Sequence, residues 1–484
     1  MKVKEALKTA AVCILCVSLV CLCAVYMLLY QQSESAAFSK EDYMKLRRGN
    51  SQYNYADSYK SSFALPAGIA FASGETYKYL LTDVNAVTAA AKEISAQFFG
   101  GLFGENSVPT ELSQKKGREL YARLASANEY IYMKYHTELP RSVIYRLSDT
   151  SRMGEDVSSE GIYDIFIFAA ASYLKITPAE AGLADGAYLC AAARDLSGNY
   201  RLYYYSLGNS GDGLFFNKKL FAAYSNYEKI TDFCFVADTD IYYGMSMAEN
   251  SDTESGIIFR SGFTMPHINR SSLYDELISE ENAEKLLRAF SMNISKIPYH
   301  VADDGTYTYY DEGKTFTISA DGKCRLSVTS YDYAVSIALA GTGADALDYV
   351  GATAAFLSSL PLFSENAKAA GVSLAISEIF VGENSARISY GYLYNNIPVF
   401  INGKHTAASF EIYDGAITGC TLEFTKISAG KGKFSLSENR TEFIALAGMG
   451  ISSADCVPAY TFDAGDSASA FWSCRYVKKE ADGK

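Results

Sequence analysis

The residue types that most often carry out catalysis are few in this sequence and widely spaced. The four histidines are His136, His267, His300 and His405, and none of them forms an HExxH or HxH pair. A zinc peptidase of that type needs two histidines one helical turn apart, so the spacing argues against this class. The chain also has no GxSxG nucleophile elbow, which argues against a serine hydrolase of that type.

Three short motifs resemble known chemical sites but lack the residues that would complete them. Ser-x-x-Lys occurs at 113–116 and at 428–431, without the SDN and KTG partners of penicillin-binding enzymes. Residues 313–315 match the end of a phosphate-binding loop, but Thr308 stands where its first glycine should be. The run from Asp238 begins like a calcium loop, yet it has tyrosine where that loop needs glycine. We therefore predict no catalytic residue, no metal site and no cofactor.

Acidic residues leave one enzymatic alternative open. Glycoside chemistry needs two carboxylates at a set separation in space and no motif in the sequence, and the chain has 55 Asp and Glu residues. A carboxylate-dependent envelope hydrolase is therefore kept as a third hypothesis. The same residues give a net charge of −12. A nucleic-acid partner is not expected, because phosphate binding needs clustered Lys and Arg.

The elements that would position such groups are short strands and a few helices. Residues 67–73 and 76–82 are expected to form a strand pair, and Asp83 should cap the alanine-rich helix that follows. A second helix is expected at 110–128. Strand-like runs then occur at 129–135, 161–169, 186–193 and 199–206. The sequence predicts an α+β domain over residues 63–207.

A glycine-rich stretch at 208–213 is the best candidate linker. After it, a helical run followed by a meander of strands occurs twice. The helical runs are 271–293 and 344–360, and the strands are 305–311, 314–319 and 323–329, then 372–381, 385–394, 397–401, 405–413 and 416–425. Asn395-Asn396 and Asp414-Gly415 stand where two-residue hairpin turns need φ > 0. We predict a central α+β domain at 208–330 and a C-terminal one at 331–480, with helices packed on antiparallel meanders.

Tyrosine is frequent, with 38 copies. In the strand at 388–394, Tyr390, Tyr392 and Tyr394 point to one face because side chains alternate along a strand. Tyrosines at this period usually cover a sheet with their rings, so we interpret most of them as structural. Aromatic surfaces also mark recognition sites. A module that binds an envelope polymer through tyrosine-lined sheets is therefore the second hypothesis.

The cysteines outside the N-terminal segment have long and irregular spacings without a CxxC pair, so neither a zinc ribbon nor a redox motif is indicated. Small disulfide scaffolds lack a core, but this chain is long enough to have one. We predict mostly free or buried thiols rather than three disulfides. The six residues are Cys190, Cys234, Cys324, Cys420, Cys456 and Cys474.

The N-terminal segment is the strongest signal. Residues 10–30 carry no charge, and these positions would span about 31 Å as a helix, roughly the thickness of the hydrocarbon core of a bilayer. A cleaved signal peptide is the alternative, but its apolar region is shorter. Lysines precede the segment, so residues 1–9 are expected in the cytoplasm. We predict a single-pass protein of the cell membrane with a transmembrane helix at 10–30, a juxtamembrane stalk at 31–62 and an extracellular domain.

The architecture and one late hairpin resemble YycH-type regulatory proteins of the YycFG (WalRK) two-component system, in a divergent clostridial form. The matching stretch is GYLYNNIPVFINGKHTAASFEIYDGAITGCTLEF, residues 391–424, in which a Tyr-x-Tyr run, two turn residues and Ile-Pro-Val follow one another. YycH is a membrane protein of Gram-positive bacteria that works beside YycI and regulates the cell-wall sensor histidine kinase YycG (WalK). Pro398 should lie on an edge strand or among the first residues of its strand.

The resemblance implies a non-enzymatic regulator whose partners are a YycG-like kinase and a YycI-like membrane protein. It also implies that the transmembrane helix touches the helices of the kinase. Helices in lipid associate through small residues that permit close backbone approach. Cys13, Val17, Cys21 and Ala24 lie within about 80° of one helix face. We predict that these four residues bind the partner.

Overall fold

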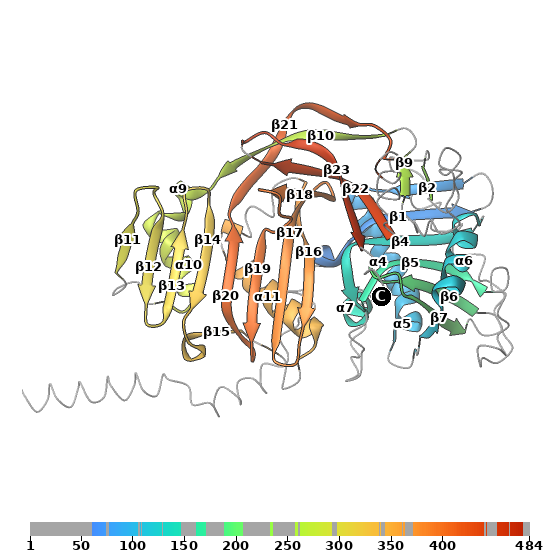
Figure 1. Ribbon diagram of the computed structural model, residues 1–484, viewed down its shortest axis with the longest axis horizontal. Coiled ribbons are helices and arrows are strands. Elements are labelled where there is room, and N and C mark those ends of the chain that lie inside the picture. Colours follow the sequence, from blue (N-terminus) through green and yellow to red (C-terminus); the bar gives the residue numbers. More distant parts are fainter. Residues whose placement is uncertain are drawn as a thin grey trace, which may run out of the picture. The chain divides into compact units, whose positions relative to one another are not determined.

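The structure is a computed structural model that describes residues 61–73, 77–104, 107, 109–127, 129–146, 161–170, 188–206, 233–235, 257–259, 262–292, 298–337, 339, 344–360, 362–363, 371–439, 442, 453–463 and 465–477. Residues 55–337 and 344–484 form one compact unit. Its described elements are mostly antiparallel strands with a few helices, which confirms the predicted α+β class (Figure 1).

The N-terminal predictions cannot be followed into the structure. The expected transmembrane helix at 10–30, nearly all of the stalk and the linker at 208–213 lie outside the described residues. Among the helices that are described, none has the length and apolar character needed to cross a bilayer.

The first sheet has seven antiparallel strands in the order β2-β1-β4-β5-β6-β7-β3. They are β1 (Pro66–Ser73), β2 (Tyr77–Leu81), β3 (Thr110–Leu112), β4 (Glu129–Pro140), β5 (Gly161–Ala169), β6 (Tyr188–Arg194) and β7 (Tyr200–Ser206). The helical segments of this part are η1 (Ser61–Ala64), α4 (Val84–Ile94), the π-helical η2 (Ser95–Phe99), α5 (Gly100–Leu102), α6 (Gln114–Ala125) and α7 (Arg141–Arg146). The helix expected from residue 110 begins later, because 110–112 pair with β7 at the sheet edge.

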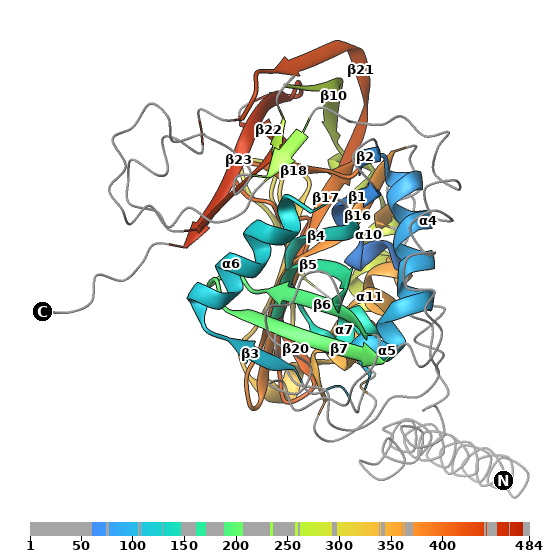
Figure 2. The ribbon, with the colours of Figure 1, turned by 90° about the vertical axis from the view of Figure 1, so that its right-hand side faces the viewer.

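Helices cover both faces of this seven-stranded sheet (Figure 2). On one face, Tyr121 of α6 packs edge to face on Phe166 of β5. On the other, Phe103, directly after α5, packs on Tyr203 of β7, and α4 contacts β1. Every residue of β6 is consequently buried. Strands buried on both faces read as continuous apolar runs rather than as alternating ones.

The second sheet has twelve strands, in the order β11-β12-β13-β14-β20-β19-β17-β18-β22-β23, with β15 beside β20 and β16 beside β17. They are β11 (Tyr299–Val301), β12 (Tyr307–Asp311), β13 (Lys314–Ile318), β14 (Lys323–Val328), β15 (Val335–Ser336), β16 (Val372–Val381), β17 (Ser385–Tyr394), β18 (Ile397–Ile401), β19 (Ala408–Tyr413), β20 (Ala416–Glu423), β22 (Ser453–Phe462) and β23 (Ser469–Val477). Both predicted meanders belong to this sheet, because β14 pairs with β20. The expected boundary between residues 330 and 331 falls within it.

The remaining elements are two strand pairs and four helical segments. The strand pairs are β10 (Phe263–Ser272) with β21 (Thr425–Leu436), and β8 (Phe233–Phe235) with β9 (Ile257–Phe259). The helical segments are α9 (Tyr274–Leu277), α10 (Glu280–Ala289), η6 (Tyr331–Tyr333) and α11 (Ala346–Ser359). Asp345 begins α11 with a capping box that it shares with Asp348.

The twelve-stranded sheet has one apolar face, which α10 and α11 cover. Phe290, directly after α10, contacts Phe316, and Phe356 of α11 contacts Phe410. The Tyr390 hydroxyl lies 2.8 Å from the Thr353 hydroxyl of α11. Figure 2 shows both helices on the same side of the strands. Tyr390, Tyr392 and Tyr394 are all buried on this face, so their rings are part of the core.

The opposite face carries two rows of mostly polar side chains, which we call the polar face. Strand register places the members of each row directly beside one another across seven strands. The rows are Thr308, Thr317, Arg325, Thr421, Ser409, Ser389 and Glu378, then Tyr310, Thr315, Ser327, Gly419, Glu411, Arg387 and Phe380.

The predicted hairpin turns are confirmed. Asn395 and Asn396 have φ of 49° and 65°, and Asp414 and Gly415 have φ of 46° and 79°. Pro398 is the second residue of β18, and the parallel pairing of β18 with β22 begins only at Val399. The proline therefore lies among the first residues of a central strand, which is one of the two placements expected for it.

Candidate functional site

The motifs that suggested chemistry have structural roles where the structure describes them. Ser113 is the N-cap of α6 and accepts a hydrogen bond from the Lys116 backbone N–H, so the first Ser-x-x-Lys is a helix start. Lys314 Nζ donates to the carbonyls of Phe290 and Ser291 at the end of α10, where a cation is favoured. The second Ser-x-x-Lys lies within β21, and the calcium-like run at 238–249 lies outside the described residues.

The described histidines lie apart from one another in the fold. The His267 ring stacks on Phe434, and the Nε2 atom of His405 lies 3.1 Å from the Tyr392 carbonyl. His300 lies in the short strand β11. Within the described ranges, no three His, Cys, Asp or Glu side chains are grouped so that they could hold a metal ion. The predicted partner-binding residues Cys13, Val17, Cys21 and Ala24 lie outside those ranges.

One cavity in the described part of the chain is lined by residues of both sheets. It has a volume of about 60 Å³, and its walls include Gly68, Lys134 and His136 from the first sheet and Asn396 and Pro398 from the second. Two strands of the first sheet, β1 and β4, are irregular here. The register shifts in β1 between Pro66 and Gly68 and in β4 after Lys134. A bulge interrupts the ladder and frees backbone groups for other partners.

Asn396 uses these freed groups to join the two sheets. Its Nδ2 donates to the carbonyls of Pro66 and Ala67 at 3.0 and 3.1 Å, and its Oδ1 lies 3.1 Å from His136 Nε2. Because the amide nitrogen faces two carbonyls, Oδ1 is the acceptor, which assigns the proton of this contact to His136 Nε2. Asn396 and His136 are both buried. The hairpin turn is thus docked through three hydrogen bonds.

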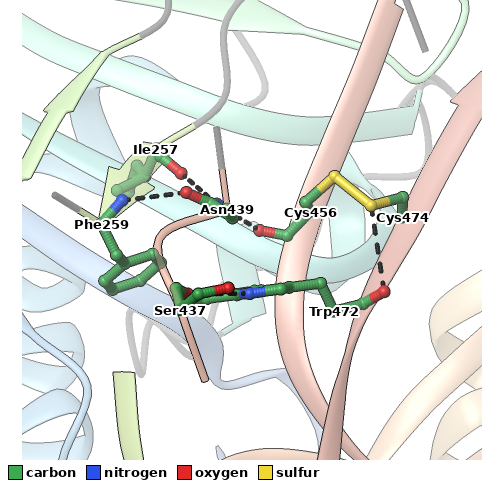
Figure 3. The surroundings of a disulfide bond; sticks show 7 residues. All are labelled: Ile257, Phe259, Ser437, Asn439, Cys456, Trp472 and Cys474. Atoms are coloured by element: carbon green, nitrogen blue, oxygen red, sulfur yellow. Dashed lines mark hydrogen bonds between the residues drawn. A yellow bond between two sulfur atoms is a disulfide. The ribbon is translucent and has the colours of Figure 1, made fainter. Parts of the chain in front are cut away.

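A second buried asparagine, Asn439, lies behind strand β9, whose Ile257 and Phe259 line the cavity (Figure 3). Asn439 is fully buried; its Oδ1 accepts from the Phe259 N–H, and its Nδ2 donates to the carbonyls of Ile257 and Cys456. Beside it, the Trp472 ring stacks on Phe259 at 5.5 Å and donates from Nε1 to the Ser437 carbonyl. Strand β9 is held in this way against the hairpin of β22 and β23, whose Val457 and Pro458 also line the cavity.

A disulfide lies at the same hairpin. Cys456 and Cys474 are directly paired across β22 and β23 and are bonded to each other. Cys190, Cys324 and Cys420 are buried free thiols, as predicted, and burial raises the pKa of each. The bridge was missed because its two cysteines are far apart in sequence. They lie at equal distances on either side of Gly465, a symmetry that could have indicated a hairpin.

A buried ionic network lies deeper in the first sheet, beneath α6. Asp164 forms an ion pair with Arg194, its direct neighbour across β5 and β6. The hydroxyls of Tyr121 and Tyr132 lie 3.0 and 3.1 Å from the two carboxylate oxygens. Burial raises the pKa of the Asp164 carboxyl, while Arg194 and the hydroxyl groups act in the opposite direction. Three side chains of the fold hold this carboxylate, so it is a structural group.

The cavity is small and is lined by both apolar and polar side chains. A volume of about 60 Å³ holds several waters, but it is smaller than the roughly 300 to 1,000 Å³ of typical small-molecule sites. Its lining includes the side chains of Lys134, Asn395 and Asn396, and His136 Nε2 is engaged by Asn396. Sequence reasoning identified the Asn395-Asn396 turn but missed its docking role, because a turn signal reports only local geometry.

Comparison with known proteins adds no relative: no family model, no curated protein and no solved structure matches this chain.

Proposed function

We propose that this chain is a non-enzymatic, membrane-anchored regulator of a cell-wall sensor histidine kinase, similar in function to YycH. Its N-terminal helix would contact the helices of the kinase in the membrane. A YycI-like membrane protein is a further partner in this proposal.

The proposal is supported mainly by the position in the fold of the hairpin within residues 391–424, on which the resemblance to YycH depends. Its tyrosines are core residues of the second sheet, its second turn residue, Asn396, docks the first sheet, and Pro398 lines the cavity between the sheets. A motif with these roles defines how the parts of an extracellular domain are joined. It therefore supports a shared architecture more strongly than a surface motif of the same length would.

Two further observations support an extracellular regulator. The Cys456–Cys474 bridge belongs in an oxidising compartment, since cytosolic proteins rarely keep structural disulfides. The described residues that suggested catalysis in the sequence serve as helix caps, ring contacts and hydrogen-bond partners. These roles favour a scaffold over an enzyme.

The test is recovery of a partner from membranes. The full-length chain, tagged at its C-terminus and extracted in mild detergent, is expected to co-purify with a sensor histidine kinase. Replacing Cys21 and Ala24 together by leucine should lower the recovery of the kinase severalfold, because bulky side chains keep helix backbones apart. Membrane insertion should be unchanged, since leucine is favourable in lipid.

The control places two volume-conserving changes on the opposite side of the helix, Leu15→Ile and Leu22→Ile. Recovery of the kinase should match the unaltered chain. A purification that yields no sensor kinase would contradict the proposed function. Equal recovery from both double variants would leave the kinase as partner but remove the proposed helix face.

A further inference from the structure

We propose that the polar face of the twelve-stranded sheet is a binding surface for an extended, uncharged glycan strand. This inference does not depend on the kinase partner and concerns a different part of the molecule. It follows from what the face carries, how its charges are arranged and where its aromatic rings lie.

Hydroxyl-bearing side chains occupy the centre of the face. In the first row, Thr317, Thr421 and Ser409 carry hydroxyls, and Arg325 lies between the two threonines on four neighbouring strands. At a strand spacing of about 4.8 Å, the seven strands give a row roughly 29 Å long. The second row adds the hydroxyls of Thr315 and Ser327. Such a surface offers donors and acceptors at regular intervals, which suits a polymer with hydroxyl groups along its length.

The charges of the two rows are balanced. The rows hold two arginines, Arg325 and Arg387, and two glutamates. Arg387 lies directly beside Glu411 in the register and 3.8 Å from Glu378. An anionic polymer needs a surplus of Lys and Arg on its binding surface, and the face has none. The expected occupant is therefore neutral.

Exposed aromatic rings lie at the border of the face. Tyr310 and Phe380, which are 47% and 57% exposed, end the second row on its two sides. Tyr413 is 51% exposed and follows Glu411 on the same face of β19. Its ring contacts Tyr331 of η6, whose hydroxyl donates to the Asp414 carbonyl. The rings are placed to cover the apolar C–H faces of sugar units.

A protein partner would leave the opposite pattern. Interfaces between proteins have an apolar centre and a polar rim, whereas this face has a polar centre and an aromatic rim. A second copy of the sheet is also unsuitable, because sheets pack face to face through apolar side chains. A neutral glycan satisfies both parts of the surface.

The experiment is co-sedimentation of the full-length chain in detergent with two insoluble neutral polymers, chitin and wall glycan stripped of its anionic polymers. We expect retention on at least one of them. Tyr310→Ala should weaken it by about fivefold or more, as for a truncated aromatic anchor. The matched control is Tyr299→Ala. Tyr299 is 63% exposed on the adjacent strand β11 but points to the other face, because it pairs with Tyr309.

Each remaining outcome decides the matter. Untreated walls, which still carry their anionic polymers, are sedimented in parallel. The absence of retention on chitin and on stripped wall glycan would overturn the proposal, and so would retention on the untreated walls alone. Equal weakening by Tyr299→Ala would show that the polar face is not the binding surface. Phe380→Ala, at the far end of the row, provides a second variant. Fluorescence of Trp472, the only tryptophan in the chain, should be unchanged in every variant and shows that the fold is retained.

Discussion

Helices cover the two large sheets of this protein in different ways, and charged residues therefore have different roles in the two sheets. Helices cover both faces of the seven-stranded sheet, so β5 is buried over all of its inner positions. In the twelve-stranded sheet, β13 and β19 instead alternate between buried and more exposed residues. Continuous apolar runs are typical of strands covered twice, and alternation is typical of strands covered once.

The difference decides how a charged residue should be interpreted. Asp164 and Arg194 lie inside the first sheet, where each can exist only because the other is beside it. Arg387 and Glu378 lie on the uncovered face of the second sheet, with about half of each side chain exposed, and an exposed pair of this kind contributes little to stability. Charges in the first sheet serve the fold, and those on the second are available for binding.

The largest expected effect is in the doubly covered sheet. Asp164→Leu leaves the buried Arg194 without its counter-ion, which should lower the free energy of unfolding by about 3 to 5 kcal/mol. The loss can be measured by urea denaturation of the full-length chain in detergent, followed by circular dichroism. Changing Asp164 and Arg194 together to leucine should recover most of the stability, because no unpaired charge is left. A single variant as stable as the unaltered chain would contradict the buried network.

The next comparison uses two adjacent residues on opposite faces of β13. Phe316 is fully buried beside Phe290, so Phe316→Ala should cost about 3 to 5 kcal/mol of unfolding free energy. Thr317 lies on the polar face, so Thr317→Ala should change it by less than about 0.5 kcal/mol. Both values come from the same denaturation measurement. Similar losses from the two variants would show that the polar face is covered.

A smaller loss than for Asp164→Leu or Phe316→Ala is expected where the two sheets meet. Asn396→Gly keeps the positive φ of the turn but removes three hydrogen bonds, so it should cost about 2 kcal/mol. Asn395→Gly is the matched control, because the neighbouring residue has the same kind of backbone conformation. Hydrogen exchange measured by mass spectrometry should show faster exchange in β1 and β4 for the first variant only. Equal exchange in both would mean that Asn396 does not dock the sheets.

Local signals predicted much of the second sheet. The turns at Asn395-Asn396 and Asp414-Gly415 need φ > 0, so the hairpins of β17 with β18 and of β19 with β20 could be inferred from neighbours in sequence. The first sheet was harder to predict. Its order places β3 beside β7, and the residues at 110–112 were expected to be helical. A short edge strand is decided by the strand that it meets, and the sequence pattern around it does not report that partner.

What the sequence determined by itself is therefore local: the α+β class, the hairpin turns, the position of Pro398 near a strand start, and the helix cap at Asp83. These depend on backbone geometry within a few residues. The tertiary structure alone decided that Asn396 meets His136, that Asn439 joins β9 to β22 and that, among the described elements, helices cover one face of the second sheet. Each of these depends on which distant segments become neighbours, and that choice depends on burial over the whole chain rather than on any single stretch of it.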